Sequence, residues 1–268
     1  MPYQRLCEQT REAVHRAAEY VREQHRNRDN LQVESKGTHD YVTRVDRQTE
    51  EILVRELSRI LPEAGFVTEE GTSVKKGEDF HWVIDPIDGT TNFIHGTYPF
   101  AISVALARGT EVVVGVVHEF GFEETFTAWK GGGAWCNGKP IRVSSAPAVK
   151  DALIATGFPY TNFSRLTEFK ASMDHFMAHS HGLRRLGSAA TDIAYVACGR
   201  YDAFYEYGLH AWDIAAGILL VREAGGRITD FAGNPDVLFS DTVACANGLC
   251  FREFQETIEK IMIRNEPV

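Results

Sequence analysis

The first part of the chain places apolar residues three or four positions apart, with charged residues between them. This spacing predicts an amphipathic helix from Tyr3 to about Asn27. A second helix is expected after Thr43, because Thr43-x-x-Asp46 precedes another apolar stripe and has the form of a capping box; Pro62 is expected to end it. The chain therefore begins with two amphipathic helices that need an apolar surface to cover.

Short runs of β-branched and aromatic residues follow, and they predict strands. Gly-rich joints and an Asn-Gly pair at 137–138 separate several of these runs, which favours hairpins. The expected strands of this part are 65–68, 82–84, 100–106, 111–117, 125–129, 134–136 and 141–143.

A segment rich in Ser, Ala and Pro at 144–150 separates this pattern from one in which strands and helices alternate. The alternation predicts an α/β protein, layered as α+β, in which helices cover the sheets. We expect two packed halves, residues 1–145 with the antiparallel sheet and residues 146–268 with the α/β pattern. The expected elements of the second half are strands 152–156, 183–186, 201–206, 227–230 and 243–246 and helices 165–178, 188–198, 213–224 and 251–263.

Composition and charge narrow the classes of function. The 268 residues include 37 acidic and 28 basic side chains, a net charge of −9, with no long Lys/Arg run, which argues against a general nucleic-acid-binding surface. No apolar run approaches the ~20 residues of a membrane span, and the N-terminus lacks a signal core, so we expect a cytoplasmic protein. Five scattered cysteines without a C-x-x-C pair indicate neither a disulfide framework nor a zinc site.

The strongest chemical signal is the stretch from Trp82 to Phe93, which reads WVIDPIDGTTNF. Its first three residues predict a buried strand, which the pair Asp85-Pro86 is expected to stop. Asp85 and Asp88 then stand at the end of the strand, beside small residues whose free backbone N–H groups can bind an anion. Carboxylates beside an anion site indicate a divalent cation that bridges them to a substrate phosphate.

Simpler interpretations of these acids are available from the sequence. Asp-x-x-Asp-Gly at the end of a strand is often a plain turn, Asp46 fits a capping box, and Asp213 can be the N-cap of a helix that begins at Ile214. Two further acids favour the metal site: Glu69 follows an expected strand, and Asp213 stands at the entry to an alanine-rich helix.

These motifs together resemble the inositol monophosphatase family. The similarity extends in family order from Lys36 to about Asn247. It implies a sugar-phosphatase-like αβαβα sandwich and a Mg²⁺-dependent, lithium-sensitive phosphatase that forms a homodimer. The residues that carry it are the stretch above, Glu69-Glu70-Gly71 before it, and Trp212-Asp213-Ile214-Ala215-Ala216-Gly217 and Glu223-Ala224-Gly225-Gly226 after it.

The resemblance also implies roles for individual residues, around two or three Mg²⁺ ions per site. Glu69 and Thr90 would orient the attacking water, with Asp46 holding the Thr90 hydroxyl, and Lys36 would lie near the metals. The implied metal ligands are Glu69, Asp85, the carbonyl of Ile87, Asp88 and Asp213. The implied substrate-binding residues are Ile87, Asp88, Gly89, Thr90, Gly187, Ser188, Ala189, Glu206 and Asp213.

The implied reaction is hydrolysis of myo-inositol monophosphate to myo-inositol and phosphate. The same chemistry on another small-molecule ester stays open: fructose 1,6-bisphosphate, a 3′-phosphorylated nucleotide or a phosphatidylinositol phosphate head group. A regulatory or binding member of the family without turnover is the alternative from another class. The intact set of acids favours an enzyme.

Overall fold

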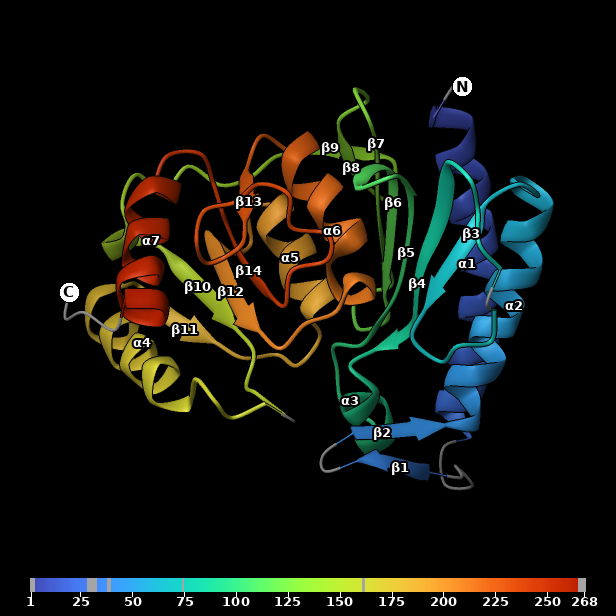
Figure 1. Ribbon diagram of the computed structural model, residues 1–268, viewed down its shortest axis with the longest axis horizontal. Helices are drawn as coiled ribbons and strands as arrows, with labels where there is room; N and C mark the ends of the chain where they lie inside the picture. Colours follow the sequence, from blue (N-terminus) through green and yellow to red (C-terminus); the bar gives the residue numbers. More distant parts are fainter. Residues whose placement is uncertain (1–2, 28–32, 38–39, 74, 161, 265–268) are drawn as a thin grey trace.

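Two large sheets and three layers of helices form the protein, stacked in the order α, β, α, β, α (Figure 1). The computed structural model describes residues 3–27, 33–37, 40–73, 75–160 and 162–264. The layered α/β sandwich expected from the sequence is confirmed. No helix of these residues has both the length and the apolar character to cross a lipid bilayer. Division into halves at 145/146 stays a prediction.

The first sheet has seven strands in the order β3-β4-β5-β6-β7-β8-β9, antiparallel except for the parallel pair β3 and β4. Helices α1 (Tyr3–Arg26) and α2 (Arg44–Ile60) cover one of its faces, because each buries an apolar stripe against the strands. The strands are β3 (Gly65–Thr68), β4 (Phe80–Asp88), β5 (Ala101–Arg108), β6 (Glu111–Glu119), β7 (Glu124–Trp129), β8 (Ala134–Cys136) and β9 (Lys139–Ile141).

The second sheet has five strands in the order β11-β10-β12-β14-β13 and is mixed, with β10 parallel to both of its neighbours. Helices α4 (Leu166–His179) and α7 (Phe251–Ile258) cover its outer face, and a π-helical turn (Glu259–Arg264) continues α7. The strands are β10 (Leu153–Thr156), β11 (Gly182–Arg184), β12 (Ala203–Tyr207), β13 (Arg227–Thr229) and β14 (Thr242–Ala246).

Helices α5 (Ala189–Ala197) and α6 (Ala211–Glu223) fill the space between the two sheets. All nine residues of α5 and nine of the thirteen residues of α6 are buried, which explains why apolar residues predominate on every side of both helices. Short helix α3 (Thr90–His95) follows β4, and the 3₁₀ turn Val149–Asp151 precedes β10. The starts of α3, α5 and α6 all face the end of β4 (Figure 1).

A two-stranded hairpin, β1 (Val33–Gly37) and β2 (Asp40–Thr43), lies beside α3. The side chain of Lys36 lies outside the described residues, so its place near the metals stays a prediction. The five cysteines are free, as the sequence indicated, and three of them are buried.

The expectation that Asp85-Pro86 ends the fourth strand is wrong, because β4 continues to Asp88. The register with β5 shifts between Asp85, which pairs with Ser103, and Asp88, which pairs with Ala101. One extra residue on β4 therefore makes a β-bulge, and Pro86 lies in it, where a missing N–H costs no ladder hydrogen bond. The bulge places both carboxylates at the same end of the strand.

Candidate functional site

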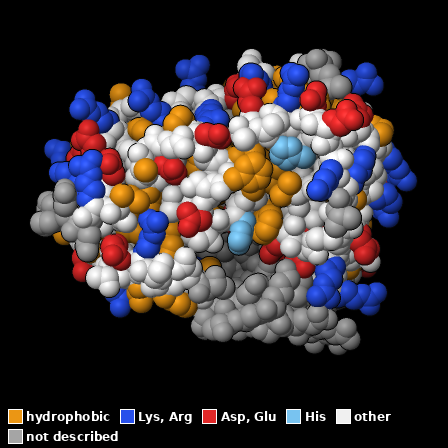
Figure 2. Space-filling view, in the orientation of Figure 1, with side chains coloured by type: hydrophobic (Ala, Val, Ile, Leu, Met, Phe, Trp, Pro, Cys, Tyr) orange, Lys and Arg blue, Asp and Glu red, His pale blue; other side chains and the backbone are white. Residues whose placement is uncertain are grey.

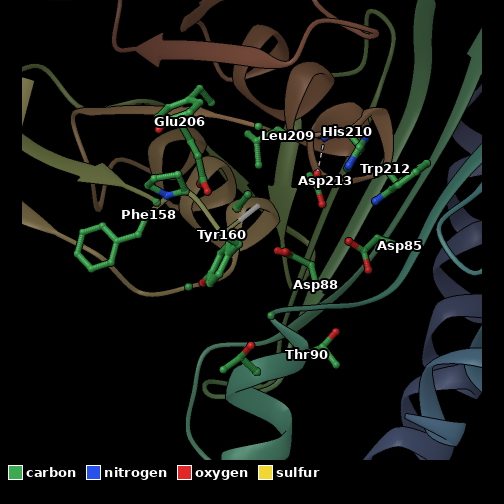
Figure 3. A pocket seen from close by; sticks show the side chains of 18 of the residues that line it. Asp85, Asp88, Thr90, Phe158, Tyr160, Glu206, Leu209, His210, Trp212 and Asp213 are labelled. Atoms are coloured by element: carbon green, nitrogen blue, oxygen red, sulfur yellow. Dashed lines mark hydrogen bonds between the residues drawn. The ribbon is translucent and has the colours of Figure 1, made fainter. Parts of the chain in front are cut away.

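A cavity of about 340 Å³ opens where β4 ends and the starts of three helices meet (Figure 3). The predicted residues that line it come from both halves of the chain: Glu69, Asp85, Ile87, Asp88, Gly89, Thr90, Gly187, Ala189, Glu206 and Asp213. Two others, Asp46 and Ser188, lie behind this lining. Figure 2 shows the hollow from outside, with histidine and hydrophobic side chains gathered above it.

The bulge of β4 fixes the two central acids. The backbone N–H of Ile87 donates to Asp85 Oδ1 over 3.0 Å. Asp88 Oδ2 accepts from Ser188 Oγ at 2.5 Å and from the Ala190 N–H at 2.7 Å. Ser188, which the resemblance places against the substrate, is the N-cap of α5, and its hydroxyl is directed to Asp88. Asp88 is thereby tied to the start of α5.

Asp213 reaches the cavity from the first turn of α6. The interpretation of Asp213 as the N-cap is wrong, because α6 begins at Ala211, three residues before the expected Ile214, and His210 is the N-cap. Asp213 instead stands at the third helical position, where Oδ2 accepts from the His210 N–H at 2.6 Å. One carboxylate oxygen therefore holds the helix start, and Figure 3 shows the side chain directed toward Asp88.

The converging acids fit a bound divalent cation. Asp85, Asp88 and Asp213 each offer an oxygen, and these atoms lie within 4.8 Å of one another; no other group of three His, Cys, Asp or Glu does so among the described residues. Two such charges ~4 Å apart repel by about 4 kcal/mol at an effective dielectric of 20. A donor set of carboxylate oxygens suits Mg²⁺.

The electrostatics of the site favour protonated carboxyl groups when no cation is bound. Burial, followed by the charge of Glu69, raises the pKa of Asp85 well above its ordinary value. Burial raises the pKa of Asp88 to about 6, although the Ser188 hydrogen bond lowers it. Burial and then the charge of Asp88 raise the pKa of Asp213 to about 7. A proton or a metal ion must therefore offset these charges near neutral pH.

Thr90 connects the cavity to the start of α2. Its hydroxyl lies 3.1 Å from Asp46 Oδ1 and 2.9 Å from the carbonyl oxygen of Ile87, and both atoms are acceptors. Asp46 Oδ2 accepts in turn from the N–H and the hydroxyl of Thr43, which completes the expected capping box. Asp46 therefore caps α2, as the capping-box pattern predicted, and contacts the Thr90 hydroxyl, as the resemblance implied.

The sequence interpretation missed a buried acid that holds the turn after β3. Glu50 of α2 accepts from the Glu70 N–H at 2.8 Å and from the N–H and hydroxyl of Thr72. This fixes the segment that delivers Glu69 to the cavity. A signal was present, since Asp46 and Glu50 stand one helical turn apart on the same stripe as buried Leu53.

The sequence interpretation also identified only part of the cavity wall that lies opposite Asp85. Glu206 was expected there, but the aromatic side chains and the arginine that share this wall were not. Figure 3 shows Phe158 and Tyr160 on the side opposite Trp212 and Asp85. The lining residues with charged, aromatic or amide groups to which the sequence interpretation gave no individual role are Phe158, Tyr160, Asn162, Arg185, Tyr207, His210 and Trp212.

Comparison with known proteins gives one consistent result. The family model described as the inositol monophosphatase family matches residues 3–263. The chain is similar to an inositol-1-monophosphatase of Rhizobium meliloti (strain 1021), with 44% identity over 232 residues, 86% of this chain and 87% of that relative. It is similar to a protein named Nus factor SuhB from Pseudomonas aeruginosa, with 42% identity over 236 residues, 86% of this chain and 87% of that relative.

A solved structure agrees with the layered fold. The crystal structure of the extragenic suppressor protein suhB from Bartonella henselae superposes with a TM-score of 0.90 and 38% identity, and the match covers 95% of this chain and 98% of that chain. The likeness thus includes both sheets and the elements around the cavity.

Proposed function

Because this chain belongs to the inositol monophosphatase family, a family of phosphatases, we propose that it hydrolyses myo-inositol monophosphate to myo-inositol and phosphate with Mg²⁺. The observation that carries the proposal is the convergence of Glu69, Asp85, Asp88 and Asp213 on one cavity from distant parts of the sequence. Four carboxylates carry −4, which two Mg²⁺ ions offset. Three further properties stay predictions: location in the cytoplasm, assembly as a homodimer and inhibition by lithium.

Different residues around the acids would have different roles in hydrolysis. Bound Mg²⁺ would supply charge neutralisation and Lewis acidity for attack on the phosphate. The Thr90 hydroxyl proton lies toward Asp46 and the Ile87 carbonyl, so its lone pairs are left to accept from a water in the cavity. Glu69 would accept from the same water, and the two together orient it for attack.

The phosphate would lie against the turn that leads from β4 into α3. Gly89 is the N-cap of α3 with φ of 89°, a left-handed conformation that only glycine adopts without strain. A Cβ there would lie 3.0 Å from the Gly187 carbonyl oxygen, so glycine also permits the close contact of this turn with the loop before α5. The backbone N–H groups of Gly89 and Thr90 are then available to the phosphate oxygens.

The alcohol would lie on the side of Glu206 and Ala189. A carboxylate accepts hydrogen bonds from vicinal hydroxyls, which suits a polyol such as inositol. Burial raises the pKa of Glu206 well above its ordinary value, and the charge of Asp192 adds to this. Substrate hydroxyls that donate to Glu206 favour its ionised form, and a hydroxyl left unpaired in so buried a position would be costly, which gives selectivity.

Steady-state phosphate release tests the proposal. With Mg²⁺, the purified protein should release phosphate from myo-inositol 1-phosphate; excess chelator should abolish the release, added Mg²⁺ should restore it, and lithium should inhibit it. Fructose 1,6-bisphosphate, a 3′-phosphorylated nucleotide and a phosphoinositide in vesicles serve as rival esters. A higher kcat/KM on one of them would change the assigned alcohol, while release that persists in chelator would refute the metal mechanism.

A regulatory role is the second candidate, and the similarity to a protein named Nus factor SuhB favours it. The complete set of acids at the cavity argues against a chain that only binds a partner. Absence of phosphate release from every ester, in a folded protein that binds Mg²⁺, would leave the regulatory candidate alone.

Replacing Gly157 by alanine tests the position of Glu206. A Cβ at Gly157 would lie 1.9 Å from Glu206 Oε1, so the carboxylate must move away. We expect KM for myo-inositol 1-phosphate to rise roughly tenfold, because the contact with the alcohol is disturbed, while kcat changes less.

The matched control is Gly248→Ala, because the nearest atom to a Cβ there is 3.6 Å away and nothing must shift. Its kinetics should equal those of the wild type. An unchanged KM in Gly157→Ala, with the variant folded by circular dichroism, would argue that Glu206 does not meet the alcohol.

A further inference from the structure

Arg185 is the one lysine or arginine among the described residues that line the catalytic cavity. Its guanidinium forms neither a hydrogen bond nor an ion pair with any residue that the structure describes, and Nε is buried without a partner. Arginine presents five N–H donors, and a buried donor that lacks an acceptor costs about 1–3 kcal/mol. The other guanidinium donors also lack an acceptor among the described residues, and a ligand in the cavity can supply one.

The guanidinium is nevertheless held in a defined place. Its Cζ atom lies 5.1 Å from the ring centroid of Phe158 and 5.2 Å from that of Tyr160. On another side it passes over Gly187, where a Cβ would lie 2.7 Å from Nη1. Aromatic faces attract the cation without providing a carboxylate or carbonyl acceptor. The surroundings therefore position the guanidinium and leave its donors free.

Nearby acids do not account for this arginine. Its charge lowers the pKa of Asp88, Asp192 and Glu206, yet none of the three forms an ion pair with it within 4.0 Å. Asp88 is already tied to Ser188 and Ala190. When two Mg²⁺ ions offset the four metal-binding acids, Arg185 is a positive charge beside the space for the alcohol.

We propose that Arg185, held by Phe158 and Tyr160, forms an anion subsite that selects phosphate esters whose alcohol carries a second oxyanion, either a carboxylate or another phosphate. This inference rests on the proposed phosphatase activity and extends it to esters other than myo-inositol monophosphate, whose alcohol carries only neutral hydroxyls. The flat guanidinium can bind either oxyanion through two parallel N–H···O bonds. A neutral hydroxyl in the same place accepts a single, weaker bond.

Two matched pairs of esters test the subsite. Glycerol 2-phosphate and 2-phosphoglycerate differ by a carboxylate, and glucose 1-phosphate and glucose 1,6-bisphosphate differ by a phosphate, so the two pairs separate the two kinds of oxyanion. For each pair, the measured quantity is kcat/KM of the more acidic ester divided by that of its partner. Arg185→Gln should lower this ratio roughly tenfold or more, mainly through KM.

The matched control is Arg184→Gln, which removes the same charge one residue away, on an exposed side chain that does not line the cavity. Its ratios should equal those of the wild type. Arg185→Lys, which keeps the charge but loses the flat fork, should give an intermediate ratio. A loss in one pair alone would assign the subsite to that oxyanion.

Two results would overturn the proposal: unchanged ratios in Arg185→Gln, or an equal loss on both members of each pair, which would make Arg185 a general counter-ion of the acids. If the wild type released no phosphate from any ester, the proposed function would fail by itself. Calorimetric affinities of the wild type and Arg185→Gln for the same pairs would then decide on the subsite, by the same ratio.

Discussion

Replacing Asp85 by asparagine should lower kcat/KM for phosphate release roughly a thousandfold, and should at the same time stabilise the metal-free protein. Asp85 is the acid on which the charges of Glu69, Asp88 and Asp213 all act. Asparagine has the same shape and keeps an oxygen for the Ile87 N–H, which now lies 3.0 Å from Asp85 Oδ1. The change therefore removes a charge and a metal ligand, while the bulge of β4 is kept.

The stability effect has the opposite sign from the effect on activity. At pH 8 without metal, we expect thermal unfolding of Asp85→Asn at a temperature several degrees higher than for the wild type, because a buried charge beside other acids is gone. Mg²⁺ should raise the unfolding temperature of the wild type strongly and that of the variant little, since stabilisation by a ligand follows its affinity.

Asp79→Asn is the matched control for both measurements. Its side chain is 71% exposed and lies away from the cavity, so both activity and unfolding temperature should equal those of the wild type. An Asp85→Asn variant that kept full turnover, or that gained as much stability from Mg²⁺ as the wild type, would remove Asp85 from the metal site.

The acids of the site could be proposed from sequence because each stands in a local pattern: at the end of a strand or in the first turn of a helix. The family and the layered fold expected from these patterns are confirmed. The patterns could not predict whether each side chain points into the cavity or toward a neighbouring residue. Ser188 illustrates this, since only the packing of α5 against β4 directs its hydroxyl to Asp88.

Arg185 and Glu50 were missed for a related physical reason. The environment of Arg185 is made by the loop that bears Phe158 and Tyr160, more than twenty positions away, and no short motif records that contact. Glu50 holds the turn before Glu69 through backbone N–H groups, which any residue type provides. Roles that depend on long-range packing or on backbone partners leave little trace in residue types.

Proline in β4 shows the reverse case, in which a sound local rule gave a wrong boundary. A proline within a strand usually ends it, because proline lacks the N–H that the hydrogen-bond ladder requires. Here the bulge between Asp85 and Asp88 needs no hydrogen bond at that position, and the strand continues. The same bulge sets the spacing of the two carboxylates, so the irregularity is part of the site.

Acidification should stabilise the metal-free protein between pH 8 and pH 6.5, a trend opposite to ordinary acid denaturation. The pKa of Asp213 is raised to about 7 and that of Asp88 to about 6, and the pKa of Asp85 is raised well above its ordinary value. An acid whose pKa is higher in the folded than in the unfolded state contributes stability at low pH and loses it as pH rises through the folded value. The folded protein therefore takes up protons in this window, which contributes on the order of 1–3 kcal/mol.

The window ends at pH 6.5 because histidines act in the opposite direction below it. Burial lowers the pKa of His118 to about 4, so the unfolded chain binds that proton first and further acid destabilises the fold.

Chemical unfolding at a series of pH values, with chelator and with saturating Mg²⁺, measures the effect. With Mg²⁺ the trend should reverse, since protons compete with the metal for the same oxygens. In Asp85→Asn with chelator, the dependence should be weaker. A wild type whose stability in chelator fell steadily from pH 8 to pH 6.5 would show that the acids of the cavity do not repel one another, and the metal site argued from their convergence would lose its electrostatic basis.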